Sequence, residues 1–240
     1  MADSKSLTCP LCNANTVVEY WSDSNGLGSK GRDSKGRDYY QCEQCQLVFV
    51  PPWQHLSAEE EKAHYDLHEN SPEDNNYRQF LSRLAGPLMA CLHSGAKGLD
   101  FGSGPGPTLS VMLEEAGFTT GIYDTFYATD ESVLAYQYDF ITATEVVEHL
   151  SQPGGELDRL WAMLKPGGWL GLMTKMVLNK DAFSQWHYKN DPTHISFFSR
   201  ETFDYLFRSW GVTAEYPAND VILVRKDTQE GCFGLKGAVV

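Results

Sequence analysis

A glycine-rich turn in the middle of the chain has the residues and spacing of a ligand-binding loop. Residues 98–106 read Gly-Leu-Asp-Phe-Gly-Ser-Gly-Pro-Gly, so Asp100 ends an apolar segment and glycines follow at every second position. Because glycine has no Cβ, such a turn lets the backbone touch a nucleotide-like ligand, and the helix expected after it exposes free N–H groups. The spacing Asp-x-Gly-x-Gly-x-Gly differs from the Gly-x-Gly-x-x-Gly of dinucleotide sites. A turn with a purely structural role is the alternative interpretation.

A second carboxylate, Asp124, follows the glycines by about 20 residues, at the end of the apolar segment 119–123. At the end of a strand next to the glycine turn, a carboxylate can accept hydrogen bonds from both hydroxyls of a ribose. We therefore expect Asp124 to bind the sugar of the ligand. The alternative is an acid that ends a strand by chance.

Four cysteines form two pairs near the N-terminus, Cys9-Pro-Leu-Cys12 and Cys42-Glu-Gln-Cys45. Each Cys-x-x-Cys turn can direct two thiolates to one tetrahedral Zn²⁺. Four cysteine ligands leave no open coordination position, so the role predicted for this zinc is structural. Four free thiols in a small β-subdomain are the alternative, but about 50 residues with few large apolar side chains fold poorly without such a cross-link.

A segment rich in aromatic and polar residues, 175–200, lies between the last parallel strand expected and the final helix. Long loops at this end of an α/β sheet usually carry function. We predict His194 as the first candidate for a general base, His187 as the second and Asp191 as an orienting partner, since a histidine titrates near neutral pH. The alternatives are a histidine that only packs or caps, and a second metal site formed by His187, Asp191 and His194.

Alternating apolar segments indicate an α/β fold with a mostly parallel sheet. The expected strands are 119–123, 138–145 and 169–174, and an antiparallel pair, 212–216 and 221–226, closes the sheet; the expected helices include 108–116 and 201–210. Few residues separate Asp124 from Tyr138, so we expect a short helix at 129–136 and a third strand that is short or missing. No adenine-binding acid can be assigned, and Asp130 and Glu131 are weak candidates.

Several motifs together resemble the class I S-adenosylmethionine-dependent methyltransferases. They are the Asp100–Gly106 turn, the segment Tyr138-Asp-Phe-Ile141 leading to Glu145-Val-Val-Glu148-His149, and the turn Leu164-Lys-Pro-Gly-Gly-Trp-Leu170. The segment Asp191-Pro-Thr-His194-Ile-Ser-Phe-Phe198 resembles a bacterial small-molecule subfamily with N-terminal zinc knuckles. The resemblance implies a doubly wound, seven-stranded-type sheet and S-adenosylmethionine as the cofactor.

The resemblance also implies a set of binding residues. The glycine turn would hold the amino-acid part of the cofactor, Asp100 would help to position it, often through water, and Glu145, Glu148 and His149 would lie at the edge of the pocket. The residues expected to bind the cofactor are Asp100, Phe101, Gly102, Ser103, Gly104, Gly106, Asp124, Thr125, Thr144 and Glu145.

The chain divides into four predicted parts. These are a zinc ribbon (1–52), connecting helices that would act as a lid (53–95), a Rossmann-like methyltransferase domain (96–226) and a tail (227–240) without an assigned role. In the second part, a capping box at Ser57 and Pro72 after Ser71 predict two helix starts.

The composition limits the function classes. The net charge of −13 disfavours nucleic acid as a partner, and neither a membrane-spanning stretch nor an apolar signal segment is visible, so we expect a cytoplasmic protein. The basic stretch Lys30, Arg32, Lys35 and Arg37 is interpreted as solvated, with an anionic partner as the alternative.

The leading hypothesis is a methyltransferase acting on a small molecule. An RNA or tRNA base methyltransferase that uses the ribbon as a substrate clamp is the first alternative, and a non-catalytic cofactor-binding or interaction module is the second. Whether oxygen, nitrogen or carbon is methylated does not follow from the sequence.

Overall fold

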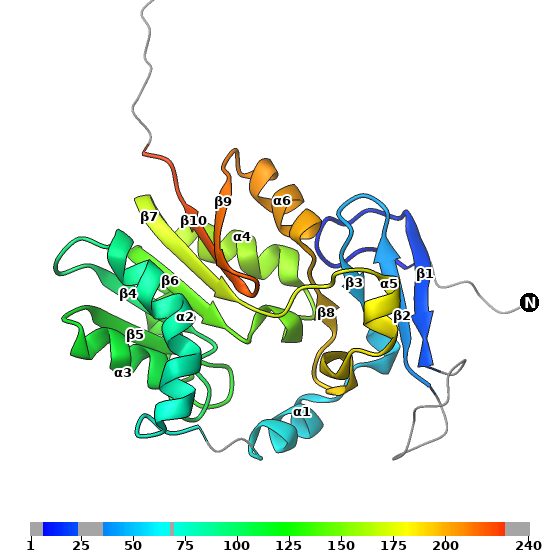
Figure 1. The fold of residues 1–240 in the computed structure, drawn as a ribbon, viewed down its shortest axis with the longest axis horizontal. Coiled ribbons are helices and arrows are strands. Elements are labelled where there is room, and N and C mark those ends of the chain that lie inside the picture. The colour runs from blue at the N-terminus through cyan, green and yellow to red at the C-terminus, as the bar shows by residue number, and fades with distance from the viewer. Residues whose placement is uncertain (1–6, 24–35, 68–69, 229–240) are drawn as a thin grey trace, which may run out of the picture.

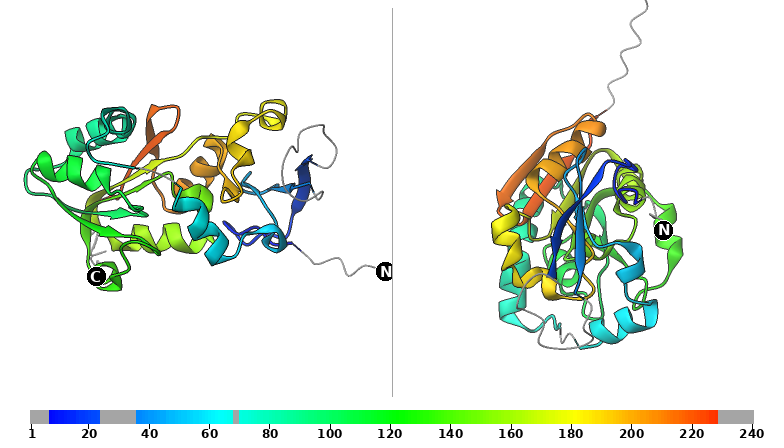
Figure 2. Two further views of the ribbon diagram at one scale, coloured as in Figure 1. Left: turned by 90° about the horizontal axis from the view of Figure 1, so that it is seen from below. Right: turned by 90° about the vertical axis from the view of Figure 1, so that its right-hand side faces the viewer.

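The computed structural model describes residues 7–23, 36–67 and 70–228, and it contains two sheets (Figure 1). A six-stranded sheet has the order β5-β4-β6-β7-β10-β9, and a four-stranded sheet has the order β1-β2-β3-β8. The larger sheet and its helices lie at one end of the molecule, and β1 and β2 lie at the other (Figures 1 and 2). The tip with Lys30, Arg32 and Lys35 and most of the tail lie outside the described residues.

The larger sheet is mostly parallel, which confirms the predicted fold class. The strands β4 (Lys97–Phe101), β5 (Thr119–Tyr123), β6 (Tyr138–Thr144) and β7 (Leu164–Met173) pair in parallel. The strand β10 (Val221–Arg225) runs antiparallel to both β7 and β9 (Ala214–Ala218). Only a 3₁₀ helix, η3 (Glu131–Ala135), lies between β5 and β6, so β5 is an edge strand and the third strand is missing, as expected.

Alternating side chains of the sheet form two hydrophobic cores, one on each face. On one face, Phe140, Val221 and Leu223 pack with α2 (Asn75–Cys91) and α3 (Thr108–Glu115). On the other, Ile141 and Ile222 pack with α4 (Pro153–Met163) and α6 (Arg200–Ser209). Two covered faces explain why these strands read as nearly continuous apolar runs.

The N-terminal strands share a sheet with the insertion that follows β7. The sheet consists of β1 (Val17–Ser22), β2 (Asp38–Cys42) and β3 (Val48–Phe49), and β3 pairs with β8 (Ser196–Phe197) of the insertion. Tyr39 from β2 and Phe183 from α5 (Lys180–Ser184) belong to one hydrophobic cluster with Phe197. Residues before position 52 and residues of the insertion therefore share one hydrophobic cluster.

Arg37 corrects the interpretation of the basic stretch. Its guanidinium is half-buried and donates to four backbone carbonyl oxygens of residues 189, 191, 192 and 194, over 2.6–3.1 Å. Lys189, itself buried, forms an ion pair of 2.6 Å with Asp23 at the end of β1. Arg37 is thus an internal contact between two segments distant in the sequence, rather than a solvated surface charge.

The connecting helices differ in one respect from the prediction. α1 (Ala58–Tyr65) has the complete capping box of Ser57 and Glu60, as predicted. We predicted that the second helix starts at Ser71-Pro72, but α2 begins at Asn75 with Asp74 as its N-cap. The Asp74 carboxylate accepts a hydrogen bond from the Asn76 N–H, which stabilises a helix start at this later position. Short 3₁₀ helices, η2 (Pro52–Gln54), η4 (Val147–His149) and η5 (His187–Asn190), complete the fold.

Candidate active site

The glycine turn lies where the order of the parallel strands reverses. β4 carries the turn at its carboxyl end and pairs with β5 on one side and β6 on the other. The N–H groups of Gly102 and Ser103 both donate to the carbonyl oxygen of Tyr123, at 2.7 and 3.2 Å, which fixes the turn against the end of β5. Open α/β sheets bind their ligands at such a switch point.

A cavity of about 920 Å³ opens at this turn. Its volume is within the range of about 300–1,000 Å³ usual for small-molecule sites. All ten residues that the sequence assigned to the cofactor line it, and so do two of the three predicted catalytic residues, Asp191 and His194. The cavity is therefore bounded by the glycine turn at one end and by the insertion at the other.

The three glycines of the turn have different structural roles. A Cβ on Gly102 would overlap the side chain of Val146, and one on Gly106 would lie 2.1 Å from the backbone oxygen of Asn70. A Cβ on Gly104, whose φ is +64°, would meet no atom of the protein within 4 Å. Only Gly104 thus presents open backbone to the cavity, whereas Gly102 and Gly106 permit contacts within the chain, which the spacing could not distinguish.

Asp100 is a buried acid at the floor of the cavity. Its carboxylate accepts a hydrogen bond of 2.8 Å from the hydroxyl of Thr142 on β6. Burial, reinforced by the charge of Asp124, raises the pKa of Asp100 to about 7. A perturbed acid in a cavity is typical of a functional site.

Asp124 supports the glycine turn directly. Its Oδ2 accepts from the N–H of Gly104 at 2.9 Å, and its Oδ1 accepts from the N–H groups of Phe126 and Tyr127 at 2.8 and 3.1 Å. A carboxylate offers about four lone-pair positions, so three are filled and little capacity remains for two ribose hydroxyls. Asp124 lines the cavity and also shapes the turn.

The turn also has one polar atom without a partner. The hydroxyl oxygen of Ser103 is buried and has no hydrogen-bond partner among the described residues.

The weak candidates for adenine, Asp130 and Glu131, are exposed and are not among the lining residues. Asp130 instead caps η3 by accepting from the N–H of Ser132. Apolar and aromatic side chains such as Phe101 and Tyr123 border this part of the cavity instead.

The connecting helix α1 contributes Glu61 and Tyr65 to the wall of the cavity. Tyr65 lines the cavity and packs edge-on against His149, with ring centroids 5.3 Å apart. His64 lies 3.3 Å from Asp191, and the hydroxyl of Tyr127 donates to Asp66 at 2.6 Å. These contacts join α1 to both the insertion and the segment after β5.

The predicted catalytic residues occupy different environments. His194 is buried at the cavity wall, with Nδ1 2.7 Å from the carbonyl oxygen of Tyr188 and Nε2 3.8 Å from Asp191. Burial and the neighbouring His149 lower the pKa of His194. Burial would raise the pKa of Asp191, but two hydrogen bonds from Thr193 outweigh it and lower the value to about 2. His187 is exposed, does not line the cavity and lies 3.5 Å from Lys175.

Two glutamates follow β6, and one of them, Glu148, lies next to His194. Glu148 is fully buried and accepts from the hydroxyl of Tyr188, and burial raises its pKa. Burial and the adjacent Glu148 raise the pKa of Glu145 to about 8, and its backbone has a φ of +53°. Such strained backbone is concentrated at functional sites. The sequence placed both acids at the pocket edge, but only Glu145 lines the cavity, and Glu148 is buried. The sequence did not indicate that the hydroxyl of Tyr188 contacts both carboxylates.

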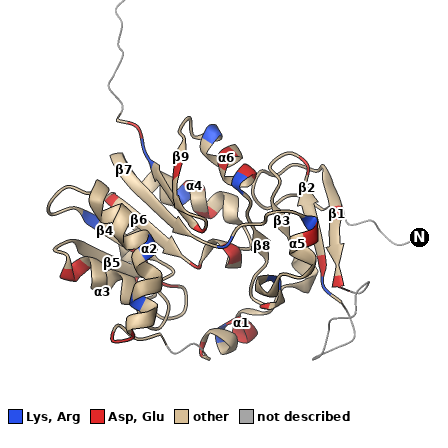
Figure 3. Ribbon diagram, viewed as in Figure 1, with Lys and Arg blue, Asp and Glu red and all other residues tan. Residues whose placement is uncertain are grey.

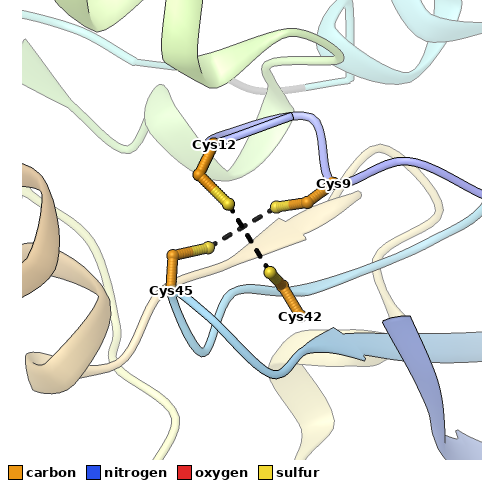
Figure 4. Close-up of side chains that lie close together, drawn as sticks. All are labelled: Cys9, Cys12, Cys42 and Cys45. Atoms are coloured by element: carbon orange, nitrogen blue, oxygen red, sulfur yellow. Dashed lines mark hydrogen bonds between the residues drawn. The ribbon is translucent and has the colours of Figure 1, made fainter. Parts of the chain in front are cut away.

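The four paired cysteines converge at a separate point (Figure 4). The sulfur atoms of Cys9 and Cys45 lie 3.5 Å apart, as do those of Cys12 and Cys42, and all four lie within 4.8 Å of one another. Zn–S bonds of about 2.3 Å in a tetrahedron require sulfur atoms about 3.8 Å apart, so the donor set fits zinc. Three of the four cysteines are buried against the core of the larger domain.

A protein-family comparison identifies the domain that carries the cavity. The family model described as a methyltransferase domain matches residues 68–215, which is more than half of the chain. The chain belongs to this methyltransferase family. No curated protein sequence matches the methyltransferase significantly.

Three of the solved structures similar to the methyltransferase have TM-scores just below 0.5 and low sequence identities. The 1,6-didemethyltoxoflavin-N1-methyltransferase of Burkholderia thailandensis, with bound 1,6-didemethyltoxoflavin and S-adenosylhomocysteine, has 17% identity, a TM-score of 0.47 and coverage of 76% of this chain and 96% of its own. An O-methyltransferase family protein of the same species has 12% identity and a TM-score of 0.48, with coverage of 64% of this chain and 57% of its own. The PH0226 protein of Pyrococcus horikoshii has 15% identity and a TM-score of 0.45, with coverage of 70% of this chain and 99% of its own. Identities this low leave the acceptor to be inferred from the chain's own residues.

A membrane-spanning role finds no support in the described helices. None of those in residues 7–23, 36–67 and 70–228 is long and apolar enough to cross a bilayer.

Proposed function

We propose that the protein transfers a methyl group from S-adenosylmethionine to a small-molecule acceptor. The observation that carries this proposal is the open backbone of Gly104 at the switch point of the sheet, facing a cavity that Asp100 and Asp124 border. The family match supports methyl transfer, and the cavity supports a ligand of nucleoside size.

The residues at the turn fit this cofactor. The unpartnered hydroxyl of Ser103 and the backbone around Gly104 offer hydrogen bonds to its amino-acid part, and the carboxyl groups of Asp100 and Asp124 border the space for its ammonium group and sugar. The cofactor supplies an activated methyl group on a sulfonium sulfur. The protein's part is to align the acceptor with that carbon and to exclude water, to which α1 would contribute through Glu61 and Tyr65 at the cavity wall.

The cavity wall also carries side chains suited to a small polar acceptor. Tyr65, Glu145, His149, Asp191 and His194 line the cavity, so hydrogen-bonding groups come from several elements. In the view of Figure 3, the described Lys and Arg positions lie scattered among Asp and Glu, which does not favour a nucleic-acid acceptor.

We also propose that Cys9, Cys12, Cys42 and Cys45 hold a structural Zn²⁺. Their convergence and the tight fit of the sulfur distances support this proposal. A zinc ion here would stabilise the sheet that positions the insertion, because β2 and β3 flank the second cysteine pair.

A transfer assay with S-adenosylmethionine labelled in its methyl group tests the proposed function. Purified protein is incubated with pools of small hydroxylated, aminated and heterocyclic compounds, and separately with total tRNA. We expect label in a small-molecule pool, and His194→Ala should lower that turnover while cofactor affinity stays nearly unchanged. Label only in tRNA would support the RNA alternative, and binding of the cofactor without transfer to any pool would support the non-catalytic one.

A further inference from the structure

Three potential metal ligands from two separate segments converge beside the cavity; His149 and His194 line it, whereas Glu148 is buried and does not. Glu148 and His149 come from η4, directly after β6, and His194 comes from the insertion. One ligand atom of each residue lies within 4.8 Å of the corresponding atoms of the other two. This group is distinct from the cysteine cluster and differs from the set of His187, Asp191 and His194 considered from the sequence, since His187 is exposed.

Both histidines are oriented as metal-bound histidines usually are. Nδ1 of His149 lies 3.1 Å from the carbonyl oxygen of Thr193, and Nδ1 of His194 lies 2.7 Å from that of Tyr188. A carbonyl oxygen only accepts, so each Nδ1 carries the proton. In the neutral rings, the lone pair is therefore on Nε2. A backbone carbonyl that fixes the tautomer in this way is a usual outer partner of a histidine ligand.

The adjacent carboxylates each have a buried oxygen without a hydrogen-bond partner among the described residues. Glu148 is fully buried, one of its oxygens accepts from Tyr188, and Oε2 has no hydrogen-bond partner among the described residues. Oε1 of Glu145 is buried and equally unpartnered, although the ammonium group of Lys175 acts on this side chain from a distance. A buried carboxylate oxygen without a donor is costly unless a cation binds it.

We propose that Glu148, His149 and His194 bind a divalent first-row transition-metal ion, with Glu145 beside it as a second negative charge. Bonds of about 2.1 Å require ligand atoms roughly 3.0–4.2 Å apart, which small side-chain rotations reach from the present spacing. Two imidazoles with carboxylate oxygens suit ions such as Zn²⁺, Mn²⁺ or Fe²⁺, and two carboxylates balance the double charge. With three protein ligands, the ion keeps open positions towards the cavity.

The site would also define the acceptor, and this consequence rests on the proposed methyl transfer. An ion here would hold an acceptor through a hydroxyl or another oxygen or nitrogen donor and lower the pKa of a bound hydroxyl. The O–H bond then breaks with its proton passing to solvent, an oxygen lone pair forms the bond to the methyl carbon, and the electron pair of the C–S bond stays on sulfur. His194 would act as a ligand rather than as the base, since its Nε2 lone pair is occupied.

Counting ions per chain tests the proposal. The full-length protein is titrated with Mn²⁺, whose free form is followed by electron paramagnetic resonance, and bound zinc and other transition metals in the same sample are measured by elemental analysis. The control variant is His93→Gln, which changes an exposed histidine outside the cavity. The wild type and this control should hold one ion more per chain than His194→Gln and Glu148→Gln, or should bind Mn²⁺ at least tenfold more tightly than those two variants. The soft cysteine site disfavours Mn²⁺ and should contribute equally in all four proteins.

Equal ion counts and equal Mn²⁺ affinities in all four proteins would overturn the proposal. A calorimetric titration with S-adenosylhomocysteine on the same samples separates this failure from failure of the proposed function, because cofactor binding does not require the ion. It also shows whether each variant is folded, and Glu148→Gln retains a side-chain oxygen that can accept from Tyr188.

Discussion

The guanidinium of Arg37 donates a hydrogen bond of 2.6 Å to the backbone carbonyl oxygen of His194. Arg37 precedes β2 of the cysteine-bearing segment, whereas His194 faces the cavity more than 150 residues later in the chain. Together with the β3–β8 pairing, this contact makes the N-terminal segment part of the wall that positions the insertion. The segment that carries the cysteines therefore contacts the backbone of the loop at the site.

Replacing Arg37 by alanine should destabilise the protein and disorder the loop at 189–194. The guanidinium donates to four carbonyl oxygens, and charge-assisted bonds contribute about 1.5–3 kcal/mol each before non-additive losses. We expect the free energy of unfolding in urea to fall by about 2–4 kcal/mol and hydrogen exchange at 189–194 to accelerate. Arg208→Ala, at an exposed position of α6, is the matched control, with a change of about 0.5 kcal/mol or less. Equal effects of the two variants would mean that Arg37 does not hold the loop.

The glycines of the turn should respond differently to the same substitution. Gly106→Ala places a Cβ against the backbone of Asn70 and should lower the melting temperature by displacing the segment before α2. Gly104→Ala meets no protein atom, so it should cost only about 1–2 kcal/mol for its positive φ and yet weaken cofactor binding strongly. Thermal unfolding and calorimetric binding measured on both variants check this contrast. Normal binding by Gly104→Ala would place the cofactor elsewhere.

Removing one cysteine of the cluster should release a metal ion. Cys42→Ser leaves three thiolates, so we expect the zinc content to fall from about one ion per chain at this cluster to near zero, with lower stability. Cys91→Ser, which changes an exposed free cysteine, should leave both unchanged. The absence of zinc from the wild-type protein after purification without chelators would contradict the assignment.

The buried acid Asp100 should make stability depend on pH. In the folded protein its pKa is about 7, raised from 3.8, so the folded state retains a proton that the unfolded chain has released between these values. Stability therefore falls as pH rises across this window, by up to about 1.4 kcal/mol per pH unit, and the loss is complete above the folded pKa. Asp100→Asn has no titrating carboxyl group at this position, so this pH-dependent loss of stability is absent from the variant. The difference in unfolding free energy between the variant and the wild type should grow from about pH 4 to pH 7 and then level off, whereas a constant difference would disprove the raised pKa.

Much of the fold could be predicted from the sequence because its signals are local. The apolar runs, the glycine turn and the paired cysteines each depend on neighbouring residues, and the short connection between Asp124 and Tyr138 predicted the missing third strand. The start of α2 was misplaced, because Ser71-Pro72 and Asp74 offer competing helix starts within four residues.

The contacts that complete the site could not be predicted because they join distant segments. Nothing local to Arg37 indicates that residues 189–194 supply its acceptors. The evenly spaced glycines also differ in their surroundings: Gly102 packs against Val146, Gly104 faces the cavity and Gly106 packs against Asn70. His187 and His194 look alike in the sequence, but only the fold decides which one is buried beside Glu148.

A calorimetric titration of the full-length protein with S-adenosylhomocysteine tests the central claim most directly. We predict one saturable site per chain, with affinity lowered about 10–100-fold in Asp124→Ala, because that change removes the acceptor of the Gly104 N–H and a charged wall of the cavity. Asp130→Ala, which changes an exposed acid outside the cavity, should bind like the wild type. No saturable heat with the wild-type protein, or equal affinity in Asp124→Ala, would contradict the account.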